Sequence, residues 1–455
     1  MSNRTVVSVE ARGDDTIEIK LAKSPGAIPN ARVPKLFACD PDAMPPWTDA
    51  GAIKAHGRTI FDKLGTHDAV KTAIGDLQKI QPPAVRSLYF HLVANVAERL
   101  SWETLCDPIG RFLALDRRWP IARMADSEVD QRLPTADFVA PLKVMALLSA
   151  IHRPAALEWK GLFQAVKDAR ADGFETELIV MVGEEPLLTS IQEQIATDKL
   201  DWVKVGPIPD RVFALGDALT AHQPHLLHFY CHGSAMSGVP QVQLATITDW
   251  DDDKASGSLI VKLEELAGFP ALSATWLVTL NCCEGGKAAN NLHSMAHTLV
   301  AGGVPAAVGM IEPIDAADAH EFASVFYPAL LSHLHGALAE SKNSHKSVEF
   351  EWAPALHPPR TALRDRHGDP LEHRVWTFPV LYVRPEPVGL RYLAPAARAA
   401  MLDPETKTRV EAVAGALRAL PPGAPEAAHI ELLNILDDVP AQFRPTLAGS
   451  LSGGG

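Results

Sequence analysis

The central part of the chain alternates short, continuously apolar runs with longer amphipathic segments. A strand that is covered on both faces of a sheet is apolar at nearly every position, whereas an amphipathic helix places apolar residues three and four positions apart. These patterns predict strands at 143–150, 175–184, 226–233, 274–283, 305–311 and 375–383. They predict helices at 156–173, 187–200, 211–223, 288–303 and 316–338. Strands that alternate with helices indicate an α/β fold whose mostly parallel sheet carries helices on both faces.

The pattern before this alternating part is mixed. Residues 5–12 and 16–22 are predicted to be strands, and 87–100 are predicted to form one amphipathic helix. We therefore expect residues 1–135 to form an α+β region that packs on a main domain at 136–388.

The pattern changes again after the last predicted strand. Residues 389–455 are rich in Ala, Leu and Pro, and they predict two helices, at 404–420 and 424–439, followed by a disordered end. The apolar positions of these helices are Val410, Val413, Leu417, Leu420, Leu432, Leu433, Leu436 and Val439. Because two short helices bury little surface on their own, we expect this tail to dock on the main domain or on a partner chain, with a regulatory role.

Composition excludes several classes of function. The formal net charge of −13 argues against a nucleic-acid or anionic-membrane surface, and no apolar run is long enough to span a membrane. The five cysteines suggest no disulfide framework, and the first residues lack the apolar core of a signal peptide. A cytoplasmic location is therefore expected. No phosphate-binding loop is present, so no cofactor is expected.

Two of the predicted strands end in residues that can carry chemistry. One ends in His232-Gly233, and another ends in Cys283-Glu284-Gly285. In parallel α/β sheets, sites form at the carboxyl ends of strands, and right-handed crossovers bring consecutive strands together. A thiolate beside an imidazole can attack a peptide carbonyl, with the imidazole as the proton acceptor and then the proton donor. The sequence thus predicts a Cys-His dyad.

Other residues near these tips have simpler interpretations. Cys231, Cys282 and His228 are expected to be buried core residues. His293 and His297 are one helical turn apart and could bind a metal with Cys282, but no further ligand motif accompanies them, so no metal is expected. The acidic run Asp249, Asp251, Asp252 and Asp253 is expected to be a solvated loop.

Five segments together resemble the CHAT family of caspase-like cysteine peptidases, in the clan of separases and metacaspases. They are "LSWETLCDPIGRFLAL", "HLLHFYCHG", "VTLNCCEGG", the stretch from "AHTLVAGGVPAAVGMIEPIDAADAHEF" onward, and "VWTFPVLYV". The resemblance implies that His232 and Cys283 are catalytic and that the N–H groups of Gly233 and Cys283 bind the oxyanion. It also implies cleavage of a partner protein in bacterial defence or regulated cell death. The partner could be a gasdermin-like pore former or another protein encoded nearby, with a separate sensor chain.

Specificity and the alternatives stay open at this stage. Carboxylates at Glu284, Asp315 and Asp318 would favour a basic residue before the cleaved bond if they face the substrate pocket. A catalytically incidental interaction or sensor protein with the same fold is the main alternative. A thiol redox protein that uses the adjacent Cys282 and Cys283 is less favoured, because adjacent cysteines can form only a strained ring.

Overall fold

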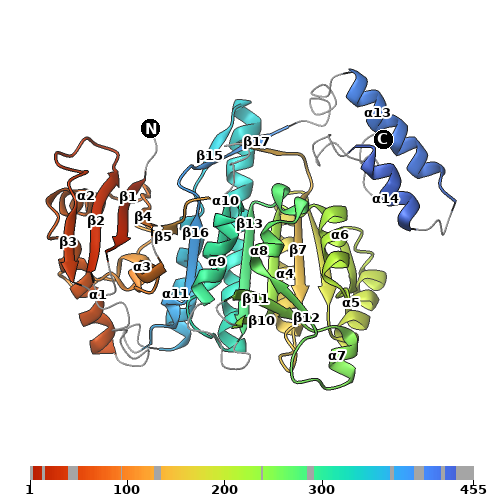
Figure 1. Cartoon of the computed structure of the whole chain (residues 1–455), viewed down its shortest axis with the longest axis horizontal. Coiled ribbons are helices and arrows are strands. Elements are labelled where there is room, and N and C mark those ends of the chain that lie inside the picture. The colour runs from red at the N-terminus through yellow and green to blue at the C-terminus, as the bar shows by residue number, and fades with distance from the viewer. Residues whose placement is uncertain are drawn as a thin grey trace.

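The structure, a computed structural model, describes residues 4–12, 16–38, 50–93, 95–127, 135–236, 239–283, 292–368, 373–393, 404–421 and 426–436. Figure 1 shows the strands side by side in one long sheet, with the N-terminal strands (red) at one end.

Among the described residues, fourteen strands form this sheet, in the order β3-β2-β1-β4-β5-β16-β14-β13-β10-β7-β8-β9, with β11 and β12 added beside β10. Their bounds are β1 Thr5–Ala11, β2 Thr16–Lys23, β3 Lys35–Ala38, β4 Leu88–Leu92, β5 Ile121–Met124, β7 Leu142–Leu148, β8 Thr176–Val182, β9 Val203–Pro207, β10 Leu226–Met236, β11 Val239–Leu244, β12 Leu259–Lys262, β13 Leu277–Cys283, β14 Ala306–Met310 and β16 Pro379–Val383. The six strands expected from the apolar runs are all present.

Strand direction divides the sheet into two halves. The strands β14, β13, β10, β7, β8 and β9 are parallel to one another. On the other side of β14, β16 runs antiparallel to it, and β5, β4 and β1 are parallel to β16. The region 1–135 therefore extends the sheet of the main domain by direct strand pairing.

Helices flank the sheet, as the sequence pattern predicted. The helices are α1 Ala50–Leu64, α2 Asp68–Gln78, α3 Asn95–Glu98, α4 Ala156–Ala171, α5 Glu185–Asp198, α6 Val212–His222, α7 Ile247–Asp251, α8 Leu263–Ala267, α9 Leu292–Ala301, α10 Ala316–Ser344, α11 His357–Arg366, α13 Pro404–Ala419 and α14 Glu426–Asn434. α4 and α10 pack against each other, and α9 packs against β10, β11, β13 and β14.

The predicted helix at 87–100 is wrong. Residues Leu88–Leu92 form β4, buried between β1 and β5, and only Asn95–Glu98 is helical. The run Leu-Tyr-Phe-His-Leu is short and rich in aromatic residues, and periodicity alone cannot separate such a run from a buried helix. This segment forms a strand because β1 and β5 pair with it on both sides.

A buried ion pair lies where this extension meets the main domain. Arg123 on β5 and Glu103 are both fully buried, with Nη2 of Arg123 2.7 Å from Oε2 of Glu103. Nη1 of Arg123 also donates to the carbonyl oxygen of Glu98 and lies 3.2 Å from the hydroxyl of Tyr382 on β16. Glu103 belongs to the "SWETLCD" segment, so that motif is structural at this position.

The end of the chain contains a second small sheet and the helical tail. β15 (Val348–Phe350), β17 (Val388–Tyr392) and β6 (Thr135–Phe138) form a three-stranded sheet, so the first residues after 388 belong to the body of the protein. Further on, α13 and α14 bury Val410, Val413, Leu417 and Leu436 in a cluster separate from the main core. Figure 1 shows this helix pair (blue) apart from the sheet.

Removal of the tail should therefore leave the main fold intact. A chain that ends at Leu393 keeps β17 but loses α13 and α14, whose described apolar residues pack on each other. We expect its thermal unfolding midpoint, followed by circular dichroism, to stay within about 2 °C of the full chain, since exposed changes away from the core cost little. A chain that ends at Pro385 loses β17 as well and should unfold at a clearly lower temperature. Equal destabilisation of both chains would contradict the separate packing of the tail.

Candidate active site

The two predicted catalytic residues lie opposite each other on neighbouring strands. β10 and β13 pair in parallel, and in this register His232 is the partner of Cys283. Residues that pair directly in a sheet lie on the same face, with their Cα atoms about 5 Å apart. The side chain of Cys283, the following residues 284–291 and thus Glu284 lie outside the described part. The backbone alone already brings the two strand tips together.

The ring of His232 is held by a backbone carbonyl. Its Nε2 lies 2.8 Å from the carbonyl oxygen of Ile151, and the residue is only 7% exposed. Because a carbonyl oxygen only accepts, Nε2 must carry the proton, and Nδ1 is then the nitrogen with the lone pair. Ile151 lies in the turn between β7 and α4. This carbonyl is therefore the group that orients the ring of His232.

Hydrogen bonds to neighbouring strands fix the turn that carries Ile151. The N–H of Ser149 donates to the carbonyl oxygen of Tyr230 on β10, and the N–H of Ala245 donates to the carbonyl oxygen of Ser149. The hydroxyl of Ser149 donates to the carbonyl oxygen of Ala245 at 2.5 Å. The turn that contains Ile151 is thus held by β10, which carries His232, and by Ala245, which directly follows β11.

A buried carboxylate lies beneath the two strand tips. Glu158 on α4 is fully buried, and its oxygens contact three donors. Nδ2 of Asn281 lies at 2.8 Å, Nε2 of His228 at 2.8 Å and Nδ1 of His320 at 2.7 Å. Asn281 precedes Cys283 by two residues on β13, and His228 precedes His232 by four on β10. Alternation along a strand therefore puts all four residues on one face of the sheet.

This network joins the four elements that surround the site. Asn281 also donates to the carbonyl oxygen of Ala319, so the first turns of α10 are tied to β13. Burial alone would raise the pKa of Glu158, but hydrogen bonds from His228 and His320 outweigh burial and lower that pKa. Glu158 is therefore a carboxylate at neutral pH, and it fixes β10, β13 and α10 relative to α4.

The carboxylates expected in the substrate pocket differ in their surroundings. Asp315 is exposed and caps α10, accepting a hydrogen bond from the N–H of Asp318 at 2.7 Å. The side chain of Asp318 is buried and contacts Nε2 of His367 at 2.8 Å and Nε of Arg366 at 3.0 Å. Burial raises the pKa of Asp318, and His367 partly offsets this. Asp315 thus presents an exposed carboxylate, whereas the carboxylate of Asp318 pairs with the side chains of Arg366 and His367.

The other residues singled out in the sequence can also be placed. Cys231 and His228 are fully buried, as predicted. The side chains of Cys282 and His293 lie outside the described residues. Nε2 of His297 lies 3.4 Å from Oε1 of Glu98, and no group of three potential metal ligands occurs among the residues that the structure describes.

One expectation about the acidic run is wrong. Asp249 is fully buried: it caps α7 together with Thr246, accepts from Ser258 and lies 2.8 Å from Nζ of Lys254. Asp251, Asp252 and Asp253 are exposed, as expected, although Asp251 is the last residue of α7 and only Asp252 and Asp253 lie in the turn that follows. The capping pattern of Thr246 followed by Asp three residues later is a recognisable signal for this structure.

The sequence interpretation missed Glu158, Asn281 and His320 as site residues. Glu158 could have been found, because it is a charged residue on the buried stripe of a helix that also contains Leu162 and Val166. Buried charges need partners, so such a position points to a polar network. Asn281 inside an apolar strand carries the same signal.

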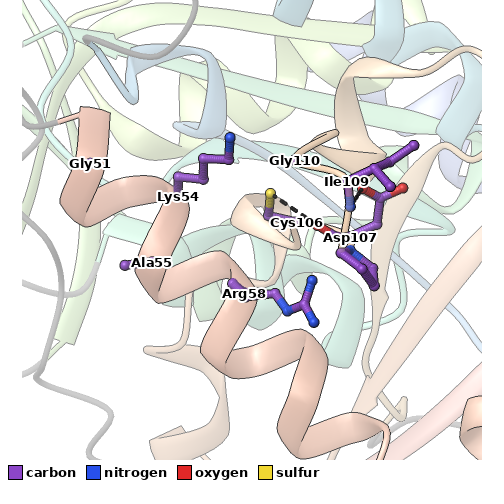
Figure 2. Close-up of a pocket in the computed structure, with 9 residues that line it drawn as sticks. Gly51, Lys54, Ala55, Arg58, Cys106, Asp107, Ile109 and Gly110 are labelled. Atoms are coloured by element: carbon purple, nitrogen blue, oxygen red, sulfur yellow. Dashed lines mark hydrogen bonds between the residues drawn. The ribbon is translucent and has the colours of Figure 1, made fainter.

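A hollow elsewhere in the protein is not part of this site. It has a volume of about 380 Å³ and lies between α1 and the turn at 106–110. Figure 2 shows Lys54 and Arg58 of α1 on one side and the turn from Cys106 to Gly110 on the other. None of the predicted catalytic residues lines it.

The fold and the site together define the class of this protein: an α/β protein with a histidine and a cysteine paired at the carboxyl ends of adjacent parallel strands. The chain matches the CHAT domain over residues 56–351, which is more than half of its length. It therefore belongs to the CHAT domain family, as its motifs indicated.

Solved structures show more distant similarities. A crystal structure of the Saccharomyces cerevisiae separase–securin complex aligns with a TM-score of 0.32 and 13% identity, over 73% of this chain and 18% of that chain. This chain thus spans less than a fifth of the matched separase chain. The Arg-specific cysteine proteinase gingipain R aligns with a TM-score of 0.36 and 11% identity, over 77% of this chain and 71% of that chain. The comparison with curated proteins gave no match.

Within the described residues, no helix combines the length and the apolar character that a membrane crossing requires.

Proposed function

We propose that this protein is a cysteine endopeptidase in which Cys283 is the nucleophile and His232 the general base. The observation that carries the proposal is the pairing of His232 with Cys283 in adjacent parallel strands. The contact between Nε2 of His232 and the Ile151 carbonyl supports it, because this contact leaves Nδ1 as the nitrogen that accepts the thiol proton.

In the proposed mechanism, Nδ1 of His232 takes the proton of the Cys283 thiol, and the thiolate attacks the peptide carbonyl. The proton then passes from Nδ1 to the leaving amine as the C–N bond breaks and a thioester forms on Cys283. Water then hydrolyses this thioester, with Nδ1 taking the proton of water and returning it to the sulfur as the carboxylic acid product leaves. The N–H groups of Gly233 and Cys283 are the proposed donors to the oxyanion. α10 begins at the carboxyl edge of the sheet and is tied to β13 through Asn281.

The proposed substrate is a protein. In line with the family resemblance, we propose a role in bacterial defence or regulated cell death, with cytoplasmic cleavage of a partner that could be a gasdermin-like pore former. A separate sensor chain would supply the activating signal. Hydrolysis that disappears in a folded Cys283→Ala variant tests the peptidase proposal, whereas a biological function that persists in this variant would favour the interaction or sensor protein.

The preferred residue before the cleaved bond should be basic. Asp315 presents an exposed carboxylate at the start of α10, and Glu284 follows the nucleophile directly in the sequence. Arg and Lys pair with carboxylates, so a library of fluorogenic peptides should show about tenfold faster cleavage after Arg or Lys than after Leu. The variant Asp315→Asn should reduce this ratio several-fold, since the amide still accepts the N–H of Asp318. A preference for Asp or for a large apolar residue would contradict the prediction.

A further inference from the structure

Beside the proposed dyad, the sheet ends in an open strand. β10 continues past His232, β11 pairs with this extension, and β12 pairs with β11. Within the part of the chain that the structure describes, β12 pairs with no second strand. The free edge of such a strand presents N–H and C=O groups with which an extended peptide can pair.

The register aligns this edge with the dyad. His232 pairs with Gln243 of β11, and Gln243 pairs with Ile260 of β12. Directly paired residues share a face, so Ile260 lies on the same face of the sheet as His232. At about 4.8 Å between strands, a peptide strand added outside β12 would run about 14 Å from β10. An extended chain crosses that distance in about four or five residues.

Buried contacts hold β12 in place. The N–H and the hydroxyl of Ser258 donate to Oδ2 of Asp249 at 2.9 and 2.7 Å, immediately before the strand. A Cβ on Gly257 would meet the carbonyl of Leu244 at 2.5 Å, so the chain approaches β11 as closely as glycine allows. Val261 is fully buried on the other face. The edge is thus formed before any peptide arrives.

The outward side chains of β12 define what it would accept. Ile260 is 41% exposed, and Lys262, two residues later on the same face, is exposed. Among the described residues, no carboxylate lies within 4.0 Å of the Lys262 ammonium. An apolar side chain would pack beside Ile260, and an acidic one two positions away would pair with Lys262.

We propose that β12 is a docking edge for an extended segment of the protein substrate, with an apolar and an acidic side chain two positions apart. The segment would lie at least about four or five residues from the cleaved bond. This inference rests on the proposed peptidase function. A four-residue edge offers far less surface than a stable dimer needs, so a transiently held substrate fits it better than a second copy of the chain.

The test measures docking separately from cleavage. A fluorescein-labelled, threonine-rich peptide with valine and glutamate two positions apart is titrated with the full-length Cys283→Ala variant, and binding is read by fluorescence anisotropy. Adding Lys262→Glu should weaken binding about fivefold, and a peptide with lysine in place of glutamate should restore it. Lys35→Glu is the matched control, because Lys35 lies on β3, the edge strand at the far end of the same sheet.

The outcomes separate the two proposals. Equal binding by the Lys262→Glu and Lys35→Glu proteins, or no binding at all, overturns the docking edge even if Cys283 proves catalytic. A dimer seen by sedimentation velocity and abolished by Ile260→Asp would show that a second copy covers β12, which also overturns it. Docking that depends on Lys262, without any cleavage by the wild-type chain, would support the edge and overturn the peptidase.

Discussion

Replacement of Cys283 by alanine should abolish peptide hydrolysis, with a loss in kcat of about 10⁴-fold or more, because the proposed acyl-enzyme forms on this thiol. His232→Ala should cause a loss of similar size, since the thiol then lacks its base. The two losses should not add in the double variant, because the residues act as one unit. The measurement is the initial rate of cleavage of a fluorogenic peptide, with circular dichroism to show that each variant is folded.

The neighbouring cysteine supplies the matched control for this experiment. Cys282→Ala removes a thiol only one residue away in the sequence. It should retain most of the activity. Iodoacetamide should label Cys283 in the wild-type chain and in Cys282→Ala, as mapped by mass spectrometry. Labelling of Cys282 in preference to Cys283, or loss of activity only in Cys282→Ala, would move the nucleophile by one residue.

Much of the central fold could be predicted because β7, β8, β10, β13, β14 and β16 are runs of mostly apolar residues. The adjacency of β10 and β13 followed from the handedness of crossovers, and that was enough to predict His232 beside Cys283. β11 and β12 were missed for different reasons: β11 contains Pro240 and two glutamines among its apolar residues, and β12 is an apolar run of only three residues followed by Lys262. Such edge strands depend on the pairing that neighbouring strands offer, which a single run of sequence does not show.

The rest of the site depended on contacts that carry no local signal. The Ile151 carbonyl orients His232, but every residue has a carbonyl, so only the folded turn shows which one is used. The Glu158 network joins residues from four elements that are far apart in the sequence. Its existence could be suspected from a charge on a buried helical stripe, but its partners His228, Asn281 and His320 become visible only in the packed structure.

Replacement of Glu158 should strongly destabilise the folded protein. In Glu158→Leu, the fully buried His228 and the Asn281 amide would lose their shared acceptor. Removal of one partner from a buried charged network costs about 3–5 kcal/mol, so this variant should unfold at much lower urea concentration or fail to fold. Glu158→Gln keeps the shape and one acceptor oxygen, and we expect a loss of about 1–2 kcal/mol in the free energy of unfolding.

The folded Glu158→Gln variant also tests whether the network positions the strand tips. Asn281 would be held less firmly two residues before Cys283, so kcat should fall about tenfold while KM changes little. The control is Asp168→Asn on the exposed side of the same helix, which should behave like the wild type. Equal kcat values for the Glu158→Gln and wild-type proteins would show that the network supports the fold alone.

The pH dependence of stability provides a second readout of Glu158. Burial raises the pKa of Glu158, but hydrogen bonds from His228 and His320 outweigh burial. The pKa is therefore lower in the folded protein than in the unfolded chain, so the ionised carboxylate stabilises the fold. The contribution is therefore fully present above the unfolded pKa of about 4.3, and it is lost as the pH falls through the lower folded pKa. The difference in free energy of unfolding between wild type and Glu158→Gln, from urea titrations, should shrink as the pH falls below about 4. A difference that does not shrink below pH 4 would mean that the Glu158 carboxylate is not the charged centre of this network.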